Sequence, residues 1–237
     1  MKILALDTAT EACSAAVYID GEILSRYRLA PREHSRLILQ MIDDLLAQVD
    51  VSVSELDAIA FGRGPGSFMG LRIAAGVVQG IAFAHDIPVI PVSTLKAIAQ
   101  RAFEQTQSKH ILTAIDARMD EVYWAAYTLD DSDETLWQAT PDECVISPDK
   151  LKLSQLLTDK SISWVGAGSG WHAYADRLLI EDEFSLQQML PDCLPSAEHV
   201  AKLAAEELKM GNTVTAAEAI PVYIRNDVAK KSKAVTF

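Results

Sequence analysis

Three short segments of the sequence carry residue types that could bind a phosphate group or a metal ion. The first, Asp7-Thr8-Ala9-Thr10, ends an apolar run and offers a carboxylate and two hydroxyls. A carboxylate can hold a metal ion, while hydroxyls and free backbone N–H groups can bind phosphate. An aspartate at a strand end more often caps its own turn, so in isolation the segment favours that structural role. Asp7, Thr8 and Thr10 are therefore weak candidates.

The other two segments are rich in glycine and precede predicted helices. Gly62-Arg63-Gly64-Pro65-Gly66-Ser67 lies between an apolar strand and a helical run, where N–H groups and the helix dipole favour an anion. No lysine follows as in a P-loop, and the spacing is not GxGxxG. A tight strand-to-helix turn explains these glycines equally well. Gly64 and Gly66 are candidates, and Gly166 and Gly168 in the similar segment at 166–170 are weaker ones.

The histidines, serines and cysteines give no catalytic or metal-binding pattern. The five histidines fall one to an element with no i,i+4 pair, and no GxSxG nucleophile elbow is present. The three cysteines are widely separated and form no CxxC pair, which fits a reduced, cytoplasmic compartment. We predict no catalytic residue, no metal ligand and no cofactor.

Composition limits the partners of this chain. Its 237 residues, 49% hydrophobic and 23% charged, predict a packed soluble protein of one large domain or two lobes. The net charge of −12 argues against direct binding of RNA, which needs clustered cations. The basic segment Lys230-Lys231-Ser232-Lys233 is more typical of a solvated terminus. The start predicts a first strand rather than a signal peptide, and polar residues interrupt the longest apolar run, so we expect no membrane span.

The periodicity predicts an α/β protein whose two halves follow a similar order of elements. In the first half, Asp20-Gly21 predicts a hairpin turn, and the stretch from Asp57 to Val92 predicts a βαβ unit. The second half begins near His110 with another pair of strands, followed by a glycine loop and a helix. The predicted strands are 3–7, 13–19, 22–29, 57–61, 89–92, 111–115, 121–129 and 162–165. The predicted helices are 35–49, 68–84, 94–104 and 195–208, and 130–134 is a predicted loop.

The predicted helix at 68–84 is apolar almost all round. Only Arg72 and Gln79 are polar in it, whereas a surface helix normally has a polar face. Gly76 and Gly80 share one face and would let another helix approach closely. Burial under the same chain is one explanation, but in so small a lobe we favour a partner protein. The predicted interface, including the helix at 35–49, consists of Leu37, Met41, Leu45, Met69, Ile73, Gly76, Val77, Gly80 and Ile81.

Three motifs together resemble one family. They are Ile3 to Thr10, Asp57 to Arg72 with its GPGSF-x-GLR pattern, and the DARM-x-EVY segment from Asp116 to Tyr123. The sequence resembles the TsaB family, also called YeaZ, from Met1 to Pro221-Val222-Tyr223-Ile224-Arg225. The resemblance implies an actin-like (ASKHA) fold of two RNase H-like lobes. Residues 1–105 would form the lobe with the partner-binding helices, and 106–237 the second lobe, with the final segment able to return to the first.

The resemblance also implies a role without catalysis. The related TsaD enzymes bind a metal with an HxxxH pair on the helix that here begins Ser93-Thr94-Leu95-Lys96, and no histidine is present there. Catalysis would then belong to TsaD, which places threonylcarbamoyl on adenosine 37 of tRNA. A TsaB-like chain would form a heterodimer with TsaD, help to recruit the ATPase TsaE, form a homodimer when alone, and meet tRNA only indirectly.

Two other functions remain open at this point. The actin-like fold also includes ATP-dependent enzymes such as sugar kinases, and the catalytic relatives were once classed as glycoproteases, so a metalloenzyme is an alternative. A free-standing RNA-binding protein is a third, for which the acidic charge is unfavourable.

Overall fold

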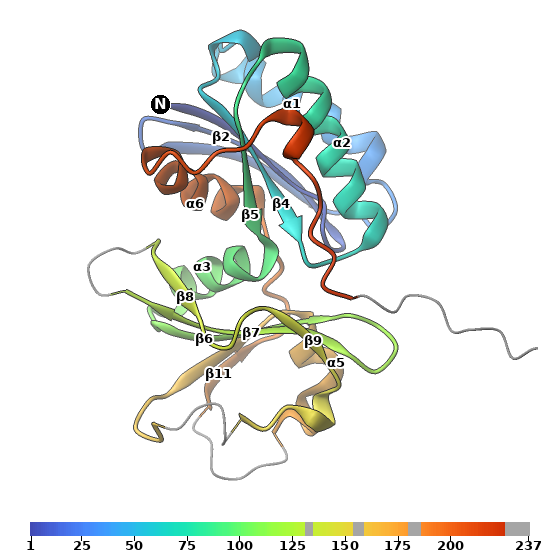
Figure 1. Cartoon of the computed structure of the whole chain (residues 1–237), viewed down its shortest axis with the longest axis vertical. Coiled ribbons are helices and arrows are strands. Elements are labelled where there is room, and N and C mark those ends of the chain that lie inside the picture. The colour runs from blue at the N-terminus through green and yellow to red at the C-terminus, as the bar shows by residue number, and fades with distance from the viewer. Residues whose placement is uncertain (131–134, 154–158, 180–185, 226–237) are drawn as a thin grey trace, which may run out of the picture.

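The computed structural model describes residues 1–130, 135–153, 159–179 and 186–225. Two β-sheets and their helices form five layers (Figure 1). Helices α1 (His34–Gln48) and α2 (Phe68–His85) cover the outer face of the first sheet. Helices α3 (Thr94–Thr106) and α6 (Ala197–Lys209) lie between the sheets, and α5 (Ser169–Leu178) covers the far face of the second sheet. The predicted α/β class is confirmed.

The first sheet has five strands in the order β3-β2-β1-β4-β5. Positive φ angles at Asp20 and Gly21 close the hairpin between β2 and β3, as the Asp-Gly pair predicts. The chain then returns through helices, so β4 and β5 run parallel to β1. The strands are β1 (Lys2–Asp7), β2 (Ala12–Ile19), β3 (Glu22–Leu29), β4 (Ala58–Gly64) and β5 (Val89–Ser93).

The second sheet has the order β11-β10-β6-β7-β8, with β9 also paired to β7. Its strands are β6 (His110–Asp116), β7 (Val122–Leu129), β8 (Trp137–Ala139), β9 (Cys144–Ile146), β10 (Trp164–Ala167) and β11 (Leu186–Leu190). The strand predicted at 162–165 begins two residues later, because the Ile162 N–H donates to Asp159 O in a turn. Most of the predicted loop at 130–134 lies outside the described residues.

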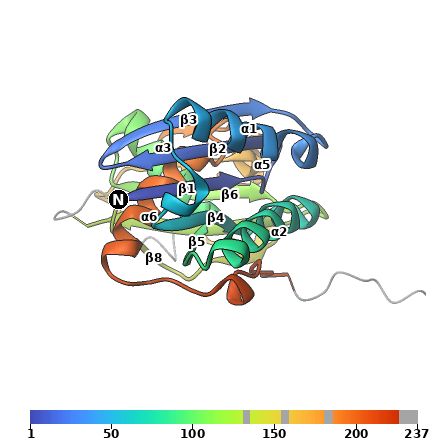
Figure 2. The ribbon, with the colours of Figure 1, turned by 90° about the horizontal axis from the view of Figure 1, so that it is seen from above.

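The chain exchanges helices between its halves. Helix α3, from the first half, packs on β6 and β10 of the second sheet, whereas α6, from the second half, packs on β1 and β2 of the first. After α6, Val214 pairs with Val89 at the edge of β5, and the short helix η3 (Ala216–Glu218) packs against α2. Residues 197–222 therefore lie along the first sheet, as Figure 2 shows from above.

Candidate protein interface

Helix α2 sits on the first sheet by one face and exposes the other. Its buried residues are Gly70, Leu71, Ala74, Ala75, Val78 and Ala82. On the opposite side, the Met69 side chain is 63% exposed and that of Phe83 is 84% exposed. The elements that pack most extensively on α2 are β4, β1, α1, η1 (Val53–Glu55) and η3, and all of them belong to the first sheet's side. Among the described residues, these elements include no strand of the second sheet and do not include α5.

The two glycines of α2 are not required by contacts within the chain. A Cβ placed on Gly76 or on Gly80 would meet nothing within 4 Å. Glycine inside a helix costs about 1 kcal/mol relative to alanine. Since packing within the chain gives no reason for either glycine, they suit the close approach of a second helix.

The predicted residues divide into three groups. Met69, Gly76 and Gly80 are exposed, while Leu37, Met41, Ile73, Val77 and Ile81 are half-buried at the edge of the core. Leu45 is 0% exposed. Its prediction as a contact residue is wrong, because eight residues after Leu37 the helix has turned its side chain toward the sheet.

Three large apolar side chains on this surface were not predicted. Leu39 on α1, and Phe68 and Phe83 on α2, are at least half exposed. The sequence spacing could have predicted Phe83, because it lies on the same helical face as Met69, Gly76 and Gly80, three residues after Gly80. Phe68 and Phe83 extend the exposed apolar stripe toward both ends of α2, and Leu39 adds an exposed apolar side chain on α1.

The start of α2 is tied to the end of the described chain. The Arg72 guanidinium lies 3.8 Å from the centre of the Phe68 ring, and Arg72 Nε donates to the Tyr223 hydroxyl at 3.2 Å. Phe68 and Tyr223 stack with ring centres 5.4 Å apart. Val222 N donates to Arg63 O at 2.8 Å. We call residues 219–225 the strap.

The strap then reaches the second lobe. Arg225 donates to Arg118 O at 3.3 Å and pairs with Glu121. Arg118, Met119 and Asp120 all have positive φ, so the turn between β6 and β7 is a strained one for side-chain-bearing residues. The strap thereby joins the GPGSF and DARM segments, which are far apart in the sequence.

The loop at Asp7 is filled by the chain itself. The Thr8 hydroxyl donates to Gly70 O at 2.7 Å, and Ser67 N donates to Ala9 O at 2.7 Å. Thr10 accepts from its neighbour Ala12 N at 3.4 Å. The Thr8 hydroxyl and the Ala9 carbonyl are thus used in packing this loop against the glycine turn and the start of α2.

Asp7 itself is fully buried. Burial raises the pKa of its carboxyl to about 7, although a hydrogen bond from Ala9 N to Oδ1 opposes this rise. The other oxygen, Oδ2, has no partner among the described residues, and neither has the Thr94 hydroxyl nearby. A Cβ on Gly62 would lie 2.0 Å from Asp7 Oδ2 and 3.6 Å from Thr94 Oγ1. This carboxylate is closed off from a metal–nucleotide complex in solvent.

The candidate glycines also have structural explanations. A Cβ on Gly64, which has a φ of 110°, would lie 2.8 Å from Val222 O, and one on Gly66 would lie 2.5 Å from Ala9 O. In the second lobe, a Cβ on Gly166 would clash with the Trp171 ring at 2.7 Å. One on Gly168 would lie 2.4 Å from Ala114 O. Each glycine permits close packing, so the structure gives no support to phosphate binding at these positions.

Among the described residues, α2 is the one helix long and apolar enough to cross a membrane, and 33% of it is buried within the chain. Its inner face packs against β4. A helix held on a sheet in this way cannot be surrounded by lipid on all sides, as a membrane-spanning helix would be.

Comparison with known proteins places this fold. A family model described as TsaD, tRNA N6-adenosine threonylcarbamoyltransferase, matches residues 23–233. The tRNA threonylcarbamoyladenosine biosynthesis protein TsaB of Escherichia coli is 42% identical, with 98% of this chain and 97% of that protein covered. TsaB of Haemophilus influenzae is 40% identical, with coverage of 98% and 96%. The chain belongs to the TsaB family.

Solved structures agree with this assignment. YeaZ from Pseudomonas aeruginosa superposes with a TM-score of 0.85 at 42% sequence identity, covering 94% of this chain and 99% of that one. The TsaB resemblance of the sequence motifs is thereby confirmed, as is the actin-like, RNase H-like fold that it implies. The strap joins two of the three TsaB-like motifs, and the third, from Ile3 to Thr10, packs against the glycine turn of the second.

Proposed function

We propose that this protein is a non-catalytic scaffold subunit in the biosynthesis of N6-threonylcarbamoyladenosine at position 37 of tRNA. It binds TsaD as a heterodimer through the outer face of α1 and α2, and the complex recruits the ATPase TsaE. The observation that carries the proposal is the exposed apolar stripe of α2 with its two unexplained glycines. The names of the TsaB relatives support the pathway.

The same face would serve a homodimer when TsaD is absent. A symmetric pair of α2 helices crossing at Gly76 and Gly80 would bury the exposed Met69 and Phe83 side chains. TsaD matches this chain as a related fold, so it can present an equivalent pair of helices to the same face. Binding of TsaD would then replace the second copy.

A scaffold role also agrees with the interior of the molecule. The Asp7 loop is packed against the GPGS turn, and α3 carries no HxxxH pair. The charge of −12 favours contact with tRNA only through the partner, in the cytoplasm where tRNA is modified. The alternative, an ATP-dependent or metal-dependent enzyme of the actin-like class, needs a loop open to its ligand, whereas here the Thr8 hydroxyl is bonded to Gly70 O and the Asp7 carboxyl is fully buried.

Reconstitution of the reaction tests the proposal. This protein is mixed with TsaD, TsaE, threonylcarbamoyl-adenylate, ATP with magnesium, and unmodified tRNA, and each protein is omitted in turn. We expect modification to require this protein together with TsaD, and this protein alone to modify nothing. Modification by this protein without TsaD, or full modification without this protein, would contradict the proposal.

A further inference from the structure

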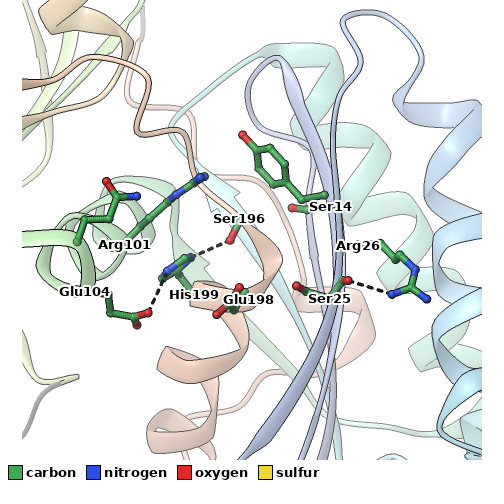
Figure 3. Close-up of a pocket in the computed structure, with 10 residues that line it drawn as sticks. Ser14, Ser25, Arg26, Arg101, Glu104, Ser196, Glu198 and His199 are labelled. Atoms are coloured by element: carbon green, nitrogen blue, oxygen red, sulfur yellow. Dashed lines mark hydrogen bonds and ion pairs between the residues drawn. The ribbon is translucent and has the colours of Figure 1, made fainter.

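A polar pocket of about 370 Å³ lies between the edge strand β3 and the helices α3 and α6. Its walls come from distant parts of the chain, with Ser25 and Tyr27 on β3, Arg101 on α3, and Ser196 and His199 at the start of α6 (Figure 3). The pocket is separate from the exposed stripe of α2, because β3, α3 and α6 do not contribute to that stripe. Its size is within the range of small-molecule sites.

Two arginines line this pocket, Arg26 and Arg101. The Arg26 guanidinium is turned toward α1 and donates to Gln48 Oε1, so Arg101 is the free cation of the pocket. Its Nη1 donates to Leu194 O at 2.8 Å, and its guanidinium carbon lies 5.1 Å from the centre of the Tyr27 ring. Among the residues that the structure describes, no carboxylate pairs with it, although the protein carries an excess of acidic groups. A guanidinium presents a planar fork of N–H donors that matches a carboxylate. Arg101 therefore has donors left for an anion that enters the pocket.

The opposite wall of the pocket carries two carboxylates, Glu104 and Glu198, whose negative charge is partly neutralised by Lys202. Lys202 Nζ lies 2.7 Å from Glu104 Oε2 and 3.1 Å from Glu198 Oε1, and His199 Nε2 lies 3.4 Å from Glu104. Burial raises the pKa of Glu104, but hydrogen bonds from His199 and Lys202 outweigh it and bring the pKa to about 2. The Lys202 ammonium sits where a metal ion bridging these carboxylates would sit. The remaining negative field opposes a doubly charged anion more than a singly charged one.

Hydroxyl groups complete the pocket. Ser196 precedes α6 but does not cap it, and its hydroxyl instead lies 2.7 Å from His199 Nδ1. Ser14 Oγ on the floor accepts from Ala197 N at 2.9 Å. Ser25 and Tyr27 bring further hydroxyls from β3. Because Ser14 also donates to Asp7 O and Ser196 is bonded to His199, the hydroxyls of Ser25 and Tyr27 are the ones that can donate to a small ligand that Arg101 attracts.

We propose that this pocket binds a small organic monocarboxylate, with Arg101 as the charge partner and the hydroxyls of Ser25 and Tyr27 as hydrogen-bond donors. The acidic wall of Glu104 and Glu198 selects against a dianion such as phosphate. This site is independent of the proposed scaffold role, so either can fail without the other.

The test is a titration of the full-length protein with butyrate, followed by ¹H–¹⁵N NMR of the backbone amides. Butyramide serves as the neutral analogue and inorganic phosphate, at slightly alkaline pH, as the dianion. We expect saturable shifts with butyrate at Ser25, Tyr27 and His199, and at least tenfold weaker binding of both other compounds. Equal binding of butyramide or phosphate, or no saturable shift with butyrate, would overturn the proposal.

Variants locate the site. Arg101→Gln should weaken butyrate at least tenfold, as should Ser25→Asp, which adds a carboxylate to the rim without disturbing the Arg101 contacts. Arg36→Gln is the matched control, since Arg36 is an exposed arginine paired with Glu33 outside the pocket, and it should bind like the parent. Unchanged affinity in a folded Ser25→Asp or Arg101→Gln protein would contradict the assignment.

Discussion

The Arg72 guanidinium contacts both the Phe68 ring and the Tyr223 hydroxyl. Tyr223 follows Arg72 by 151 residues in the sequence. This contact fixes the strap against the exposed start of α2. Because Arg225 on the same strap holds the turn of β6 and β7, the proposed interface and the second lobe are linked by one short segment. The stability of that segment can be measured directly.

Tyr223→Ala should release the strap. Loss of the ring stack and of the hydrogen bond from Arg72 removes about 1 kcal/mol of local stability, since both contacts are half-exposed. We expect faster amide hydrogen exchange over 219–225, measured by mass spectrometry. Ile220→Ala, which removes an exposed side chain of the same segment, should change exchange much less. Equal exchange in Tyr223→Ala and the parent would show that the stack does not hold the strap.

Gly76→Ala and Gly80→Ala should each make the monomer more stable and the complex weaker. Each alanine should raise the free energy of unfolding by up to about 1 kcal/mol, because neither Cβ meets anything in the chain. The added methyl groups should weaken self-association and TsaD binding at least tenfold. Chemical denaturation and analytical ultracentrifugation measure the two effects. Tighter association together with higher stability would argue against close helix contact at the glycines.

Val77→Arg places a charge at the edge of the exposed stripe. The side chain is half-buried, so the long arginine stem can lie along the surface while its charge prevents apolar contact. We expect a folded monomer that neither dimerises nor binds TsaD, as judged by circular dichroism and size-exclusion chromatography. Gln188→Arg, at an exposed position of β11 in the other lobe, is the control. An unfolded variant or an unchanged complex would count against this face.

Asp7 should make stability depend on pH. Its pKa is about 7 in the folded protein, against 3.8 for an aspartate in an unfolded chain, so the folded state holds the proton more tightly. The stabilisation is complete below pH 3.8 and is lost as the pH rises to about 7. The loss is on the order of 4 kcal/mol. Asp7→Asn keeps the shape and should remove this component of the pH dependence in urea titrations between pH 4 and pH 8. An identical pH dependence in both proteins would show that Asp7 does not titrate in this range.

Nucleotide and metal should bind poorly to this chain. The Asp7 loop is closed by Ser67 and Gly70, so isothermal titration with ATP and magnesium should show no micromolar binding. Elemental analysis of the purified protein should find no stoichiometric metal. Either a micromolar affinity or one metal ion per chain would revive the enzyme hypothesis.

Sequence patterns predicted most elements of the fold for a physical reason. Alternation and helical spacing reflect which face of an element is buried, so β1 to β5 and the four long helices were found within two residues at almost every end. The TsaB-like motifs gave the overall fold. Which residues of a helix are buried was harder to predict, as Leu45 shows. The rotation of a helix about its axis on the sheet depends on contacts with strands that are distant in the sequence.

The polar pocket and the strap could not be predicted in this way. Ser25, Arg101 and His199 meet only because α3 and α6 exchange places between the sheets. The same is true of Arg72 and Tyr223, whose contact depends on the path of the final segment along α2. The exposed position of Phe83, by contrast, could have been predicted from the sequence, since Phe83 continues the helical spacing of Gly76 and Gly80.

Hydrogen exchange of α2 with and without purified TsaD tests the central claim most directly. If the exposed stripe is the binding face, amides of α2 and α1 should be protected in the complex, while those of β10 and α5 should exchange as in the free protein. Protection confined to the second lobe, with α2 unchanged, would contradict the account.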